Sequence, residues 1–132
     1  MPMKFTVVIL GAPEGSLSSR SALEFCRALL EQNHQIERLF FYADGVHNAS
    51  SLIAPPQDEA DLPASWSQLI NEYKLDAVVC IAAALKRGIL DHNEQTRYEK
   101  NAANLGACFS LSGLGQLIAA SSVSDRTITF GS

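Results

Sequence analysis

The sequence lacks the features of a membrane protein and of a general nucleic-acid binder. No apolar run in its 132 residues approaches the ~20 residues that a membrane-spanning helix needs. The opening MPMKFTVVILGAPEG has one lysine and passes into Gly, Pro and Glu, which indicates a strand rather than a signal peptide. Ten Lys and Arg against fourteen Asp and Glu give a net charge of −4. This balance argues against direct binding to a nucleic-acid backbone, although it leaves open an RNA pathway reached through partner proteins.

Cysteine is scarce, and the familiar motifs for metals and phosphates are missing. Cys26, Cys80 and Cys108 are an odd number and lie far apart, so they predict no disulfide framework and suit a reducing cytoplasm. The three histidines lack metal-ligand spacing with each other or with the cysteines. Neither the Walker pattern, G-x-G-x-x-G nor G-x-S-x-G occurs, and GAPEGS (11–16) resembles a phosphate loop without its lysine. We therefore expect no metal and no bound cofactor.

The remaining composition predicts one α/β domain spanning 1–132. The chain is 47% hydrophobic and 18% charged, which is enough apolar surface for a packed core. Strand-like and helix-like patterns alternate, which is typical of a mostly parallel sheet of about five strands with helices on both faces. The predicted strands are 4–10, 35–45, 76–82, 107–113 and 125–131. The predicted helices lie around 22–30, at 58–74 with Asp61 as N-cap, at 82–88, at 93–101 and at 113–123 with Ser112 as cap.

In such a sheet, ligands usually bind and catalytic residues usually lie beyond the carboxyl ends of the strands. The first three predicted strands end at Gly11, at 42–45 and at Cys80, so these segments should meet at one edge. His34 precedes the second strand and should lie at the opposite edge. The long segment 47–60, with Pro55 and Pro56, is expected to lie near Cys80 and offer a docking surface.

Cys80 is the candidate reactive residue. It ends a strand just before AAALKRG, where a helix start together with Lys86 and Arg87 would favour a thiolate, the nucleophilic form of cysteine. The alternative is a buried cysteine that acts as a small hydrophobe. That alternative is favoured for Cys26, on the apolar face of the first helix, and for Cys108, which could otherwise be a resolving thiol.

Three stretches carry a resemblance to a known family. They are LFFYADGVHNASSLIAPPQDEADL (39–62), VVCIAAALKRGILD (78–91) and NLGACFSLSGLGQLIAASSVSDRTITF (104–130). The most specific pieces are FFY-x-DGV, the cysteine before AAALKRG, and SLSGLG. Together they resemble the DsrE-like family of sulfur-relay proteins over nearly the whole chain.

The resemblance implies a function as well as a fold. It implies a cytoplasmic sulfurtransferase whose sulfur-accepting cysteine falls on Cys80 and which assembles with TusB-like and TusC-like subunits. Sulfur would arrive from a TusA-like donor and leave towards a TusE-like acceptor, in a relay that supplies 2-thiouridine at the tRNA wobble position. Persulfide exchange follows the rules of thiol–disulfide exchange and needs no cofactor or metal.

Other functions remain open at this point. A DsrE-type subunit of a sulfur-oxidation complex would use the same chemistry with a different flow of sulfur. A non-catalytic assembly subunit is a second alternative, although the presence of Cys80 counts against it. A small-anion or nucleotide-binding domain that uses 11–16 is a third.

Overall fold

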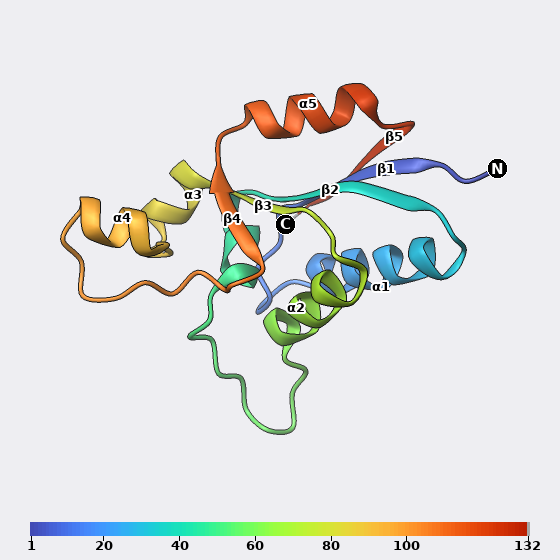
Figure 1. Cartoon of the computed structure of the whole chain (residues 1–132). Coiled ribbons are helices and arrows are strands. Elements are labelled where there is room, and N and C mark those ends of the chain that lie inside the picture. Colours follow the sequence, from blue (N-terminus) through green and yellow to red (C-terminus); the bar gives the residue numbers. More distant parts are fainter. Residues whose placement is uncertain (132) are drawn as a thin grey trace.

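The computed structural model describes residues 1–131, and a five-stranded parallel sheet forms its centre (Figure 1). The strand order is β4-β3-β2-β1-β5, and every neighbouring pair is parallel. The predicted class, a mostly parallel sheet of about five strands, is confirmed. The strands are β1 (Lys4–Ile9), β2 (Gln35–Phe41), β3 (Ala77–Cys80), β4 (Phe109–Ser112) and β5 (Arg126–Phe130).

Helices cover both faces of this sheet, as predicted (Figure 1). The longer helices lie on the two faces of the sheet, and the short helices lie near the carboxyl ends of the central strands. The first face carries α1 (Ser18–Glu31) and α2 (Leu62–Tyr73), and the second carries α5 (Gly115–Val123). The short helices are the 3-10 helix η1 (Ala43–Ala49), α3 (Ile81–Lys86) and α4 (His92–Arg97).

The core lies between the sheet and the helix pair α1 and α2. Phe41 in β2 meets Trp66 edge-on at a centroid distance of 5.2 Å and Phe109 at 5.4 Å. Phe41 and Trp66 are completely buried, and burial of a large apolar side chain contributes about 1.5–3 kcal/mol. The central strands are therefore fixed firmly, and the loops at their carboxyl ends start from rigid positions.

Of the two helix caps predicted from the sequence, one is confirmed and the other is wrong. Asp61 caps α2 as predicted, because its Oδ1 accepts a hydrogen bond from the Ala64 amide at 3.1 Å. The predicted cap at Ser112 is wrong, because α5 begins after Leu114 without a side-chain cap. The carbonyl of Gly113 instead accepts from the Gln116 amide at 3.1 Å, so the main chain closes this helix end.

Candidate active site

Cys80 is the last residue of β3 and the residue from which α3 begins. It lies opposite Ser112 in the β3–β4 ladder, and only 3% of its surface is exposed. The helix predicted at 82–88 starts one residue earlier, at Ile81. Because a rigid central strand ends at this thiol, its position is set by the sheet rather than by a loop.

The carboxyl ends of the strands meet as the sequence predicted. The amide of Tyr42 donates to the carbonyl of Ile9 at 3.0 Å, which joins the ends of β2 and β1. The second strand is shorter than predicted, however. It ends at Phe41 because the segment that follows winds into η1, whose Gly45 amide donates to the Tyr42 carbonyl at 2.9 Å. His34 lies at the opposite edge, as predicted, where its Nδ1 accepts from the Met3 amide at 3.0 Å.

Cys80 lines a cavity of about 430 Å³. Its walls come from three segments that are distant in the sequence: the start of η1, the helix α3 and the turn before α5. The lining residues are Tyr42, Ala43, Cys80, Ala82, Ala83, Lys86, Arg87, Gly113 and Leu114. Since the thiol is almost fully buried, we infer that a reagent reaches it through this cavity.

The basic pair beside Cys80 does not act as two free charges. Arg87 Nε lies 2.8 Å from Asp44 Oδ1, and Arg87 Nη1 donates to the carbonyl of Ala83 at 3.1 Å. The charge of Arg87 is therefore largely matched by a carboxylate from η1. Lys86 has no ion-pair partner within residues 1–131, so it is the free cation of this cavity. The sequence-based expectation that both residues supply positive charge is corrected accordingly.

A buried polar network holds η1 in place, and no sequence signal pointed to it. Asn48 is completely buried; its Nδ2 donates to the carbonyls of Gly11 and Gly45 at 3.0 and 2.9 Å, and its Oδ1 accepts from Ser19 Oγ at 2.8 Å. Trp66 Nε1 in turn donates to Ser19 Oγ at 3.1 Å. These groups all have partners, and such satisfied networks fix one arrangement of their segments. The network thereby positions the wall that η1 gives to the Cys80 cavity.

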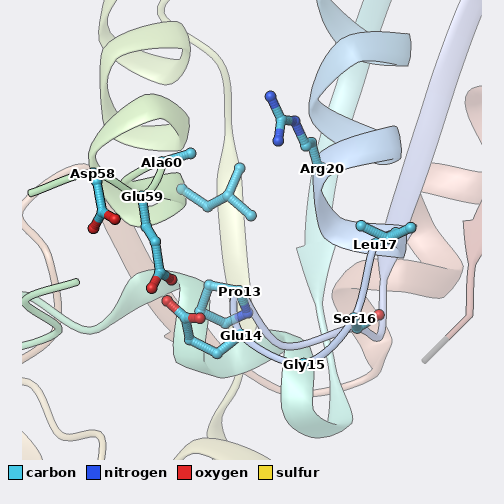
Figure 2. A pocket seen from close by; sticks show the side chains of 10 residues that line it. Pro13, Glu14, Gly15, Ser16, Leu17, Arg20, Asp58, Glu59 and Ala60 are labelled. Atoms are coloured by element: carbon cyan, nitrogen blue, oxygen red, sulfur yellow. The ribbon is translucent and has the colours of Figure 1, made fainter. Parts of the chain in front are cut away.

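The segment 47–60 does not cover Cys80, contrary to the expectation from the sequence. None of its residues lines the Cys80 cavity. Its end faces the loop after β1 instead, across a separate cavity of about 480 Å³ (Figure 2). That cavity is lined by Glu14, Asp58 and Glu59 as well as by Arg20, so carboxylates outnumber the single guanidinium. This charge balance does not favour an anion at 11–16.

The other two cysteines differ from Cys80 in their surroundings. Cys26 is completely buried on the inner face of α1, as predicted, and Cys108 is half-buried with its Sγ 3.6 Å from Ser67 Oγ. All three are free thiols. Within residues 1–131 no group of three or more His, Cys, Asp or Glu side chains could hold a metal ion. The helices of this same part of the chain include none that is long and apolar enough to cross a membrane.

Cys26 should stay unreactive at neutral pH and should make the fold sensitive to alkali. Burial raises the pKa of its thiol from 9.0 to about 12. The unfolded chain therefore ionises first, so this stability is fully present below about pH 9 and is lost as the pH rises towards 12. Urea unfolding between about pH 8 and about pH 11 should show a flatter dependence of the unfolding free energy on pH for Cys26→Ala than for the wild type. The difference in slope should reach up to about 1.4 kcal/mol per pH unit. Parallel profiles would contradict the assignment.

Comparison with known proteins gives consistent matches. The model of the DsrE/DsrF-like family matches residues 3–130. The sulfurtransferase TusD homolog of Pseudomonas aeruginosa is 52% identical over 98% of both chains. The DsrE protein of Allochromatium vinosum is 46% identical over 98% of this chain and 99% of its own, and the sulfurtransferase TusD of Salmonella dublin is 41% identical over 97% and 100%. The crystal structure of the E. coli YchN protein shares the fold, with a TM-score of 0.78 over 97% of this chain and 99% of its own at 22% identity.

Proposed function

The chain belongs to the DsrE/DsrF-like family and is a sulfurtransferase similar to TusD, and from this premise we propose that Cys80 is the residue that accepts and passes on the sulfur. The observation that carries the proposal is the position of Cys80. It ends a central strand and lines a cavity whose wall also includes Lys86, which has no ion-pair partner among the residues 1–131 that the structure describes. Neither Cys26 nor Cys108 lines this cavity.

The transfer needs only thiol chemistry. The Cys80 thiolate attacks the terminal sulfur of a donor persulfide, a new S–S bond forms, and the donor leaves as a thiolate. In the second step an acceptor thiolate attacks the terminal sulfur held on Cys80, and Cys80 leaves as a thiolate. The sulfur atom keeps its oxidation state and its proton, so no external oxidant or reductant takes part.

We further propose the direction of the relay. A TusA-like protein supplies the sulfur and a TusE-like protein removes it, in the cytoplasm, towards the 2-thiouridine of tRNA. The test is to load a TusA-like protein with radiolabelled sulfur and to follow the label. Label that passes to this chain and then to a TusE-like protein supports the proposal. Label that stays on the donor, although a small persulfide loads Cys80, would contradict the proposed donor.

A second direction of sulfur flow has a specific observation in its favour. The DsrE protein of Allochromatium vinosum is 46% identical to this chain, which is close to the 52% of the TusD homolog. A DsrE-type subunit of a sulfur-oxidation complex would carry sulfur on the same Cys80. Loss of 2-thiouridine from the tRNA of a strain without this gene would favour the tRNA pathway. Normal 2-thiouridine with impaired sulfur oxidation would favour the alternative.

The surface of α5 supports assembly with related subunits. Leu114, which directly precedes α5, is 45% exposed, and Ile118 and Val123 within the helix are 70% and 56% exposed, while Ala120 is the one buried residue of this helix. Exposed apolar side chains grouped on one helix are typical of a protein interface. We propose that TusB-like and TusC-like subunits bind this chain and that α5 contributes to the contact.

Replacing Ile118 with aspartate should weaken that assembly. An interfacial aspartate would be desolvated without a partner, so co-purification with the TusB-like and TusC-like subunits should fall at least about tenfold, the loss of affinity that 1.4 kcal/mol represents. Because Ile118 is largely exposed in the single chain, the fold should be unaffected. Ser21→Asp, on the exposed side of α1, is the matched control. Equal recovery of both variants would exclude α5 from the interface.

A further inference from the structure

A second, larger hollow lies next to the Cys80 cavity. It has a volume of about 750 Å³, and it is formed by α3 and the segment that follows α4. We call it the Lys86–Lys100 groove. Its lining residues are Leu85, Lys86, Gly88, Leu90, Tyr98, Lys100 and Ala102. Lys86 lines both the groove and the Cys80 cavity, so the two hollows are adjacent across one side chain.

The Lys86–Lys100 groove combines apolar side chains with two lysine ammonium groups. Leu85, Leu90 and Ala102 supply apolar surface, and half of Tyr98 is exposed. Neither Lys86 nor Lys100 has an ion-pair partner within the described 131 residues. The whole chain carries a net charge of −4, whereas the lining of this groove includes two lysines and no acidic residue. Such a surface attracts a segment that is apolar and acidic.

The groove is also preformed. Asn104 joins its two sides: its Oδ1 accepts from the Leu90 amide at 2.9 Å, and its Nδ2 donates to the Gly88 carbonyl at 3.1 Å. The backbone of Lys100 is fixed in both directions by Gln95, whose carbonyl accepts from the Lys100 amide at 3.0 Å and whose Nε2 donates to the Lys100 carbonyl at 2.6 Å. A surface that is already ordered loses little conformational entropy when it binds a partner.

We propose that the Lys86–Lys100 groove binds an acidic, apolar segment of the protein that takes sulfur from Cys80. This inference rests on the proposed function. The sulfur-passing step requires an anionic nucleophile, the acceptor thiolate, to approach from outside and reach a thiol that is 3% exposed. Lys86 stands between groove and cavity, where its ammonium attracts that thiolate. The acceptor thiolate then attacks the terminal sulfur, forms a new S–S bond and releases Cys80 as a thiolate.

The test compares two lysine-to-glutamate variants in the assembled complex. Lys100→Glu reverses a charge in the groove but not in the Cys80 cavity. Lys74→Glu makes the same change before β3, at the opposite edge of the sheet, where Lys74 is exposed and has no ion-pair partner among residues 1–131. The TusE-like protein serves as acceptor, and Cys80 is loaded either from glutathione persulfide, a small donor, or from the TusA-like protein. The rates of loading and of transfer to the acceptor are measured at low and at high salt.

We expect Lys100→Glu to slow transfer to the acceptor roughly 3- to 10-fold at low salt, with a smaller effect at high salt, because charge steering is screened. Loading from glutathione persulfide should be unchanged in both variants, and Lys74→Glu should transfer at the wild-type rate. Equal rates of sulfur transfer to the acceptor in the two variants would contradict acceptor binding in the Lys86–Lys100 groove. Slower loading of Lys100→Glu from the TusA-like donor, with normal transfer to the acceptor, would also contradict this proposal. Failure of the wild type to load from glutathione persulfide would refute the proposed function itself.

Discussion

Replacing Cys80 with serine is expected to abolish sulfur transfer completely. A hydroxyl cannot form a persulfide, so neither loading nor passing can take place. The fold should survive, because serine is close to cysteine in size and the position borders a cavity. We expect a change in the free energy of unfolding of no more than about 2 kcal/mol, as for a buried polar group with incomplete hydrogen bonding. Transfer of radiolabelled sulfur and urea unfolding measure the two effects separately.

Cys108→Ser is the matched control for that variant. Cys108 is half-buried and lies outside the Cys80 cavity, so its replacement should leave transfer at the wild-type rate. If Cys108→Ser lost transfer while Cys80→Ser kept it, the assignment of the reactive thiol would be wrong. If both variants lost transfer, Cys108 would be a second participant, such as a resolving thiol.

Replacing Gly45 with alanine is expected to lower the free energy of unfolding by more than Cys80→Ser does. An added Cβ would approach the carbonyl oxygen of Ile9 far within van der Waals contact, and the obstacle is main chain that cannot rotate away. Overpacking against a rigid neighbour costs about 3 kcal/mol or more. Because η1 must shift, Tyr42 and Ala43 should move with it and distort the Cys80 cavity. Urea unfolding and the rate of Cys80 loading should both reveal this change.

Gly115→Ala is the matched control for Gly45. Gly115 opens α5, and an added Cβ there would meet no atom within 4 Å. Because no positive φ requires glycine at this position, alanine should stabilise the protein by roughly 0.4–1 kcal/mol, chiefly by restricting the unfolded chain. If Gly45→Ala were as stable as Gly115→Ala, the close contact between η1 and β1 would not exist in solution.

The sequence was sufficient for the parts of the fold that depend on local pattern. The β-branched run in β1 and the apolar strand that ends at Cys80 predicted buried parallel strands, and their carboxyl ends meet as expected. Asp61 is predictable as a cap because a short carboxylate before a helix accepts a hydrogen bond from the main-chain amide three residues on. These signals lie within a few neighbouring residues, so they can be read without knowledge of the tertiary structure.

The parts that were missed depend on contacts between residues distant in the sequence. Asn48 looks like any loop asparagine until the loop after β1 and helix α1 pack around it. Arg87 was expected to be a free charge because its partner Asp44 lies 43 residues away. The predicted position of segment 47–60 is wrong, since a loop with two prolines carries no pattern that specifies which element it packs against. The Lys86–Lys100 groove likewise appears only when α3 and the segment after α4 come together.

The role proposed for Cys80 is tested most directly by locating the sulfur that the intact chain acquires from a small persulfide donor. The chain is incubated with glutathione persulfide, its intact mass is measured, and the free and modified cysteines are mapped after digestion under non-reducing conditions. We predict one added sulfur atom, on Cys80, with Cys26 and Cys108 unmodified. An added sulfur found mainly on Cys26 or Cys108, or no added sulfur on folded protein, would contradict the role proposed for Cys80.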